Sequence, residues 1–357
     1  MNKIKQNVKW DKFIILILTI LISIVVVACG NSNEEAVAES SENGETNDEM
    51  NDNQNEENDG SEELIEVEQL TNWYAQAEQG GQFAAHMEGF YEDAGLDMTI
   101  QAGGGGISNV QLVASGQVDF GMGSTDEIIL SREEGIPLVA IAGIFQQSPQ
   151  ALMFHKGQDI EDFEDLNGRD VYVGAGASYF EFMKAEFDLD VNEFAYTGDS
   201  TTFMQNEEAV SQSYMTSEPF NLEKEGIEVD WLLNGDSGYE VYGNLLFTTE
   251  EMIEEQPEVV RAYVEASIKG WEYYEEHHEE VIPFIQEYNP EMSTEQLEYS
   301  AVAMQPLVYG YDAEEYGVGY MTEERWQNIM EILYNLELIS EQQDVTEAFT
   351  TEFLPGN

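Results

Sequence analysis

The order of apolar and glycine-rich segments predicts an α/β protein. Short apolar runs, expected as strands, alternate with segments whose apolar residues recur every three or four positions, expected as helices. The connections are short, which is typical of parallel strands joined by crossing helices. This alternation begins near Leu64, pauses near Pro149 and restarts at Ala151.

The first half of the alternation covers residues 64–144. Phe83, Met87 and Phe90 follow one another at helical steps and predict one continuous helix. We expect strands at 65–70, 98–101, 118–121 and 137–144, and helices at 80–93, 109–115 and 126–134.

The second half repeats this plan and then changes to helices alone. We expect strands at 151–155, 170–173, 194–196, 212–215, 229–233 and 245–247, and helices at 162–166, 179–187 and 202–210. Helices then follow at 257–288, 295–304 and 322–336. The first of these carries an apolar stripe through Val260, Val264 and Trp271, which predicts that one face is buried.

The N-terminus has a basic head and an apolar run that ends at Cys29, the chain's only cysteine. This arrangement predicts a secretory signal, and a lone cysteine has no partner for an internal disulfide. Residues 1–29 resemble a bacterial lipoprotein signal peptide with its lipobox, in which Cys29 is lipidated. The alternative is a plain transmembrane anchor, which gives no reason for Cys29 to lie at the junction. Both place the remaining chain outside the cytoplasm, at a membrane.

The net charge of the chain limits which classes of partner it can bind. The 357 residues carry a formal net charge of -61, from 73 Asp and Glu against 12 Lys and Arg. Such a polyanion repels nucleic acid and anionic lipid, so neither is expected as a partner, and it indicates a saline or alkaline medium. Residues 30–63 are acidic and nearly free of large apolar side chains, which predicts a disordered tether. The alternative is an acidic tail that binds a metal or a partner.

Five stretches carry a family resemblance: Gly80–Ile100, Gln111–Ser124, Arg132–Phe154, Tyr214–Phe220 and Met321–Trp326. In this order they resemble the substrate-binding proteins of ABC importers, in the branch that contains thiamine-pyrimidine-precursor, aliphatic sulfonate, taurine and nitrate binders. The resemblance implies a two-lobed, periplasmic-binding-protein-like (type II) fold with a hinge and a central cleft. Lobe 1 would comprise residues 64–151 and 244–350, and lobe 2 residues 152–243.

The resemblance also implies a function. The protein would be a monomeric, extracytoplasmic lipoprotein on the outer face of the cytoplasmic membrane. It would deliver a small solute to an ABC permease and ATPase, with no catalytic residue, cofactor or metal. A sensory ectodomain is the non-enzymatic alternative to a transport receptor. One eukaryotic relative of the family makes the thiamine pyrimidine with an iron site rich in cysteines, which the mature chain lacks.

Candidate ligand-binding residues follow the strands, because ligands of open parallel sheets lie beyond the carboxyl ends of the strands. Trp73 and Tyr74 are placed to stack on a planar ligand or cap the cleft, and packing alone is the alternative. Ser124, Thr125 and Asp126 are placed to hydrogen-bond a ligand, or only to cap the next helix.

The second half of the chain supplies two further groups of candidates. The loop with Gly174, Gly176, Ala177 and Ser178 offers backbone N–H groups at a helix start, without the Gly-Lys-Ser/Thr of a phosphate loop. Glu218, before a proline, is expected at the mouth of the cleft, and Asp236 and Tyr239 near the hinge. In the family that the chain resembles, the segment equivalent to this glycine-containing loop often holds the polar head of the ligand.

Charge favours one ligand class. Asp126, Glu218 and Asp236 make the expected cleft electronegative, and Lys184 is the only base near a strand-end loop. An amino-bearing or cationic aromatic solute, such as a thiamine-pyrimidine precursor, is therefore favoured. A sulfonate, taurine or nitrate receptor is the alternative. The His277–His278 pair is not expected to bind a metal, because adjacent helical residues point about 100° apart.

Overall fold

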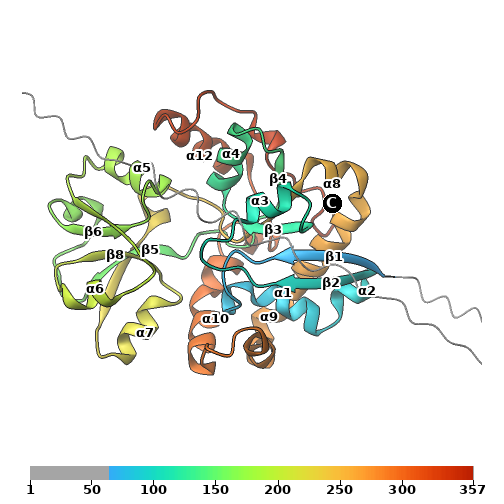
Figure 1. Cartoon of the computed structure of the whole chain (residues 1–357), viewed down its shortest axis with the longest axis horizontal. Helices are drawn as coiled ribbons and strands as arrows, with labels where there is room; N and C mark the ends of the chain where they lie inside the picture. Colours follow the sequence, from blue (N-terminus) through green and yellow to red (C-terminus); the bar gives the residue numbers. More distant parts are fainter. Residues whose placement is uncertain (1–63, 357) are drawn as a thin grey trace, which may run out of the picture. The chain divides into compact units, whose positions relative to one another are not determined.

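The computed structural model describes residues 64–356, which form two five-stranded sheets surrounded by helices (Figure 1). The first sheet has the order β2-β1-β3-β10-β4 and the second β7-β6-β8-β5-β9. The strands of the first sheet are β1 (Ile65–Leu70), β2 (Leu96–Gln101), β3 (Phe120–Gly123), β4 (Leu138–Ala142) and β10 (Leu245–Thr249). Those of the second are β5 (Gln150–His155), β6 (Asp170–Val173), β7 (Asn192–Ala195), β8 (Val210–Tyr214) and β9 (Val229–Leu233).

Both sheets are mixed: they contain the parallel strands expected from the sequence and, in addition, antiparallel ones. Strand β1 runs parallel to β2 and β3, but β10 runs antiparallel to β3 and β4. In the second sheet, β6 is parallel to β7 and β8, whereas β5 is antiparallel to β8 and β9. The antiparallel strands are those at which the chain passes between the sheets, and the helix–strand alternation does not encode their direction.

Helices connect the strands and cover the sheets. They are α1 (Gly80–Met87), α2 (Phe90–Asp93), α3 (Asn109–Ala114), α4 (Thr125–Glu133), α5 (Ser178–Glu186), α6 (Thr201–Gln205), α7 (Glu218–Lys224), α8 (Glu250–Glu255), α9 (Pro257–Tyr288), α10 (Thr294–Tyr309), α11 (Ala313–Tyr316) and α12 (Glu323–Asn335). Single turns of 3-10 helix lie at Ala77–Gln79, Phe163–Leu166, Asn234–Ser237 and Val345–Glu347.

Two predicted helices are corrected. The helix expected at 80–93 is broken into α1 and α2 at Gly89, whose φ of 72° is left-handed and interrupts a right-handed helix. The helix expected at 202–210 ends at Gln205, and Val210 is already the first residue of strand β8. The apolar residues of this segment are compatible with a helix or a strand. Val210 belongs to the strand because it pairs with Val171 and Phe154 of the neighbouring strands.

Close contact between helices α1 and α9 supports the first sheet. Gly81 lies against the indole ring of Trp271, and Gly270 lies against the backbone oxygen of Gly81. A Cβ atom at either glycine would meet these atoms at 2.2 Å, so hydrogen at both positions permits the approach. Further along α9, Tyr263 stacks on Phe120 of β3 with ring centroids 3.7 Å apart, which joins the helix to the sheet.

The segments that connect the two sheets pair with each other. Phe145 follows β4 and Gly243 precedes β10, and each donates its backbone N–H to the other's carbonyl, at 2.9 and 3.1 Å. Arg325 donates to the carbonyl oxygens of Gln146 and Glu240, one on each segment. The two connections therefore form one hydrogen-bonded unit.

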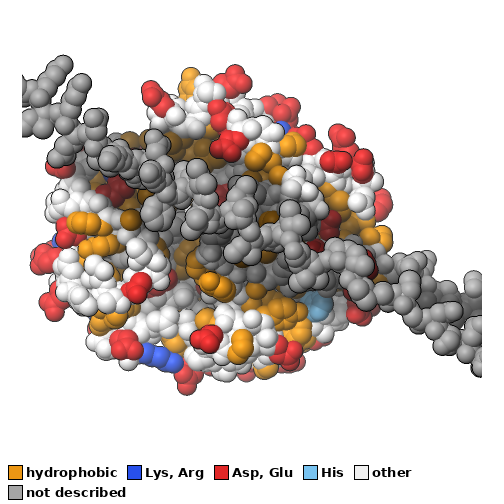
Figure 2. Space-filling view, in the orientation of Figure 1, with side chains coloured by type: hydrophobic (Ala, Val, Ile, Leu, Met, Phe, Trp, Pro, Cys, Tyr) orange, Lys and Arg blue, Asp and Glu red, His pale blue; other side chains and the backbone are white. Residues whose placement is uncertain are grey.

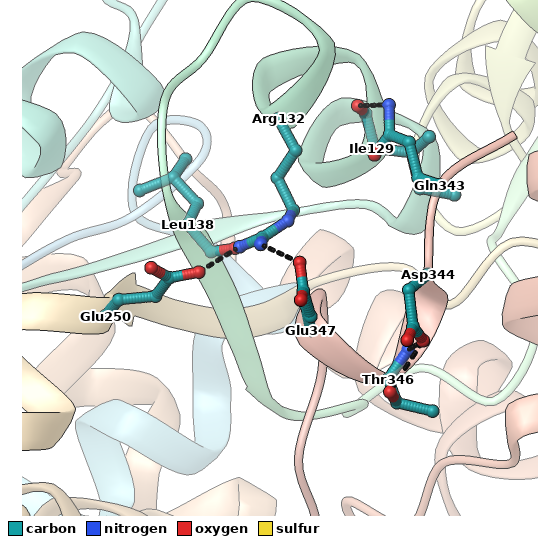
Figure 3. Close-up of polar contacts among 8 residues, drawn as sticks. All are labelled: Ile129, Arg132, Leu138, Glu250, Gln343, Asp344, Thr346 and Glu347. Atoms are coloured by element: carbon teal, nitrogen blue, oxygen red, sulfur yellow. Dashed lines mark hydrogen bonds and ion pairs between the residues drawn. The ribbon is translucent and has the colours of Figure 1, made fainter. Parts of the chain in front are cut away.

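The C-terminal segment returns to the outer edge of the first sheet. Ala140 of β4 donates to the carbonyl of Ala348 and accepts from the N–H of Thr350. Arg132 of α4 donates to the carbonyl of Leu138 and pairs with Glu250 and Glu347, at 2.8 and 3.4 Å (Figure 3). These contacts cover the edge of β4, whose residues are all buried.

Acidic side chains are spread over the visible face rather than gathered into one patch (Figure 2). Among residues 64–356, no helix is both long enough and apolar enough to span a bilayer. The predicted signal peptide with Cys29, and the predicted tether at 30–63, lie outside the described residues and remain predictions.

Candidate functional site

Two adjoining cavities lie at the strand ends of the two sheets. One has a volume of about 370 Å³ and the other about 310 Å³. Both are lined by Asn72, Tyr214 and Asn244, so they form one continuous candidate site. Their remaining walls come from segments that follow β1 and β3 in the first sheet and β6, β7 and β8 in the second, and from the two connections between the sheets. This is the position at which α/β sheets bind ligands.

The segment after β1 forms one wall. Thr71 directly follows strand β1 and holds the turn, because its hydroxyl donates to the carbonyl of Trp73 and accepts from the N–H of Gly103. Trp73 lines the larger cavity with 45% of its surface exposed, and Tyr74 meets its ring edge-on at 5.3 Å. Asn72 donates to Asn244, at 2.8 Å, which ties this wall to the returning connection.

The start of α4 forms the wall of the smaller cavity. Ser124 caps the helix reciprocally with Glu127, as sequence reasoning allowed. Asp126 makes contacts outside its own helix: its Oδ2 accepts hydrogen bonds from the hydroxyls of Ser178, at 2.5 Å, and Tyr239, at 2.8 Å. Since Ser178 begins α5, this carboxylate joins a helix of the first sheet to a helix of the second.

The opposite wall comes from the second sheet. The N–H of Gly174 donates to Gln212 Oε1 at 2.6 Å, so this loop is tied to β8. Glu218 Oε2 accepts from the N–H of Tyr214 at 2.7 Å, and Oε1 accepts from the hydroxyl of Tyr196 at 3.4 Å. The turn between β8 and α7 is thereby fixed, with two tyrosines and a carboxylate facing the larger cavity.

The predicted site residues divide into two groups. Seven line a cavity: Trp73, Ser124, Asp126, Ala177, Ser178, Glu218 and Tyr239. Five do not: Tyr74, Thr125, Gly174, Gly176 and Asp236. Thr125 is buried and accepts from the N–H of Tyr242, and Asp236 accepts from Gln147. Contact of the lining residues with a ligand remains a prediction.

Sequence reasoning missed several polar lining residues: Asn72, Gln76, Glu78, Gln79, Glu127, Tyr196, Gln212, Tyr214 and Asn244. Asn72 and Tyr214 carried a usable signal, because Tyr214 is the last residue of β8 and Asn72 is the second residue after β1. Glu78 and Asn244 carried none, since only the packing of the two connections brings them to the cavity.

The charge of the site is negative. Carboxylates of Glu78, Asp126, Glu127 and Glu218 line it, and within residues 64–356 neither cavity is lined by Lys, Arg or His. Lys184, the one base expected nearby, instead pairs with Glu181 and Glu193, at 2.8 and 2.9 Å.

The protonation of these acids is perturbed. Burial raises the pKa of Glu78 from 4.5 to about 7. Desolvation, and then repulsion from Asp126, also raises the pKa of Glu127, although its side chain is exposed. Burial raises the pKa of Glu218. Near neutral pH the site therefore holds carboxyl groups that readily exchange protons.

Metal-binding geometry is absent from the part of the chain that the structure describes, where no three His, Cys, Asp or Glu side chains are grouped for an ion. His277 stacks on Tyr273 with ring centroids 4.3 Å apart, and its Nδ1 lies 3.0 Å from that residue's carbonyl oxygen.

Comparison with known proteins places the chain in a family. Residues 76–281 match the NMT1/THI5 like family, and the chain belongs to it. This confirms the family resemblance expected from the sequence.

Named relatives include binding proteins and an enzyme. The chain is 27% identical to the riboflavin-binding protein RibY of Chloroflexus aurantiacus, over 67% of this chain and 71% of that protein. It is 26% identical to the formylaminopyrimidine-binding protein of Halalkalibacterium halodurans, over 62% and 70%. It is 22% identical to 4-amino-5-hydroxymethyl-2-methylpyrimidine phosphate synthase of Legionella pneumophila, over 80% and 91%.

Solved structures show the same fold. The aliphatic sulphonate binding protein SsuA of Escherichia coli superposes with a TM-score of 0.64 at 14% identity, covering 83% of this chain and 95% of that one. A Candida albicans protein described as having the generic periplasmic binding protein fold gives a TM-score of 0.58 at 13% identity, over 82% and 98%. The chain therefore has the predicted periplasmic-binding-protein-like α/β fold.

Proposed function

We propose that this protein is the solute-binding lipoprotein of an ABC importer and that it captures a planar, nitrogen-rich solute without changing it. One observation carries the proposal: the cavity at the strand ends combines Trp73, Tyr196 and Tyr214 with carboxylates and has no basic lining residue within 64–356. Aromatic rings stack on planar heterocycles, and carboxylates accept hydrogen bonds from ring and exocyclic N–H groups.

The relatives support the same ligand class. Two of them are named for binding riboflavin and formylaminopyrimidine, which are both nitrogen heterocycles. A sulfonate, taurine or nitrate ligand is less compatible, because an anion among Glu78, Asp126 and Glu218 would meet repulsion without a compensating cation. The proposed partners are an ABC permease and ATPase, and the proposed anchor is a lipid on Cys29 that holds the monomer at the outer face of the cytoplasmic membrane.

A pyrimidine-forming enzyme is the second candidate, since the Legionella relative is named a synthase and aligns over most of both chains. The two functions differ in what happens to the ligand. A receptor returns the captured solute unchanged, whereas an enzyme converts it into a different compound. Mass spectrometry of the solute and of the intact protein after long incubation distinguishes them.

Calorimetric titration with riboflavin, a formylaminopyrimidine, an alkanesulfonate, taurine and nitrate tests the proposal. We expect measurable binding of at least one heterocycle and none of the three anions at the same concentrations. A bound ligand should also raise the melting temperature, because it stabilises only the folded state. Binding confined to the anions would overturn the proposed ligand class.

The variant Trp73→Ala should weaken binding of the heterocycle about 10-fold or more, because stacking of a base on an aromatic ring contributes about 1–3 kcal/mol. Tyr74→Ala is the matched control: it removes the neighbouring aromatic ring, which lies outside the lining of both cavities. Equal losses in the two variants would place the ligand elsewhere. Titration calorimetry of both variants makes the comparison.

A further inference from the structure

Glu78 differs from every other acidic or basic residue in the described part of the chain. Within residues 64–356 it is the only Asp, Glu, Lys or Arg that is buried, with 2% of its surface exposed. It is the middle residue of the 3-10 turn Ala77–Gln79, which precedes α1, and it also lines the larger cavity. A buried carboxylate is therefore part of the wall of the proposed binding site.

The partners of Glu78 satisfy only part of its carboxylate. The hydroxyl of Thr216, in the turn after β8, donates to Oε1, and the side chain of Asn244 donates to the backbone oxygen of Glu78 at 2.6 Å. The other carboxylate oxygen, Oε2, is buried and has no hydrogen-bond partner. The acceptor capacity of Glu78 is thus incompletely used by the protein itself.

The charged surroundings of Glu78 do not compensate for its burial. Glu218, which lines the same cavity, raises the pKa of Glu78 further, and Glu78 also interacts with the hydroxyls of Tyr214 and Tyr274. The hydroxyl of Tyr274 is itself buried without a partner. No Lys, Arg or His within 64–356 lines the cavity. A buried carboxylate without a cation is strongly unfavourable unless a proton or a ligand neutralises it.

We propose that Glu78 determines specificity by accepting a hydrogen bond from an amino group or protonated ring nitrogen of the solute. The proposal rests on the proposed function and deepens it, since it selects aminopyrimidine-like solutes from among planar heterocycles. A solute with an N–H donor completes the hydrogen bonding of the carboxylate, whereas one with only acceptors leaves it unpaired. An anionic solute adds repulsion.

Two matched probes test this: 4-amino-2-methylpyrimidine and 2-methylpyrimidine, which lacks the amino group. At pH 8 we expect the wild-type protein to bind the amino compound about 10-fold or more tightly than its analogue, because a hydrogen bond to a charged group contributes about 1.5–3 kcal/mol. In Glu78→Gln this preference should fall to less than about 3-fold. Glu134→Gln, an exposed acid outside both cavities, is the control and should keep the full preference.

The outcomes separate this inference from the function on which it rests. Equal binding of both probes to the wild type, or an unchanged preference in Glu78→Gln, overturns the role of Glu78 and leaves the receptor function standing. Absence of binding of either pyrimidine overturns the role of Glu78, and the titrations with riboflavin and the three anions then decide whether the proposed ligand class stands. Equal binding of the two probes to the wild type overturns the role of Glu78 without any variant, and near-ultraviolet circular dichroism reports whether Glu78→Gln folds.

Discussion

Replacing Gly270 by alanine should lower the free energy of unfolding by about 3 kcal/mol, which is at the upper end for overpacking in a core. A Cβ atom at this position would lie 2.2 Å from the backbone oxygen of Gly81 and 2.6 Å from the Cβ of Ala85, so helices α1 and α9 would have to separate. A backbone atom cannot rotate away as a side chain can. Urea denaturation followed by circular dichroism measures the change.

Helix propensity acts in the opposite direction and makes the test specific. Alanine in a helix interior is favoured over glycine by about 1 kcal/mol, so without the close contact Gly270→Ala would stabilise the protein. Glu272→Ala, on the exposed face of α9, is the control and should change stability by less than about 0.5 kcal/mol. A neutral or stabilising Gly270→Ala would show that α1 and α9 are further apart than described.

The variant Glu78→Gln should remove a large part of the pH dependence of stability. The folded state raises the pKa of Glu78 from 4.5 to about 7, so between these values it holds a proton that the unfolded chain has lost. Stability therefore falls as pH rises from about 4.5 through 7, and the full penalty, about 3 kcal/mol for this group, is present above pH 7. The glutamine variant cannot ionise and should lack this loss.

Urea denaturation of both proteins at pH 4.5 and pH 8.5 measures the effect. The raised pKa values of Glu127 and Glu218 act in the same direction in both proteins, so the difference between the two pH profiles reports Glu78 together with its repulsion from Glu218. Parallel profiles would mean that the Glu78 carboxylate is hydrated in the folded state. A neutral residue at position 78 is therefore expected to stabilise the protein at high pH and to weaken binding of the solute.

The sequence predicted the architecture well because hydrophobic periodicity is a local signal. The alternation of elements, its pause near Pro149 and the change to helices after β10 all correspond to what the structure shows. Strand direction was not predictable, since the reversal of β10 depends on where a distant connection re-enters the first sheet. Likewise, Gly89 reads as an ordinary helical residue until its left-handed backbone is seen.

The candidate site was predictable only as far as the strand ends. Trp73, Asp126 and Glu218 stand next to strands or helix starts, and the rule that ligands lie at carboxyl strand ends located them. The role of Asp126 in joining α4 to α5 was not visible, because Ser178 is 52 residues away along the chain. Glu78 was missed for the same reason: its burial depends on Thr216 and Asn244, which belong to distant segments.

The C-terminal segment matters for how molecules of this protein behave toward one another. An uncovered strand at the margin of a sheet offers unpaired N–H and C=O groups to a second molecule and so promotes aggregation. The N–H and the carbonyl of Ala140 are hydrogen-bonded to Ala348 and Thr350. A chain that ends before residue 345 would therefore leave the apolar edge strand β4 uncovered. The segment around Ala348 and Thr350 thus covers the edge at which a second molecule would otherwise pair.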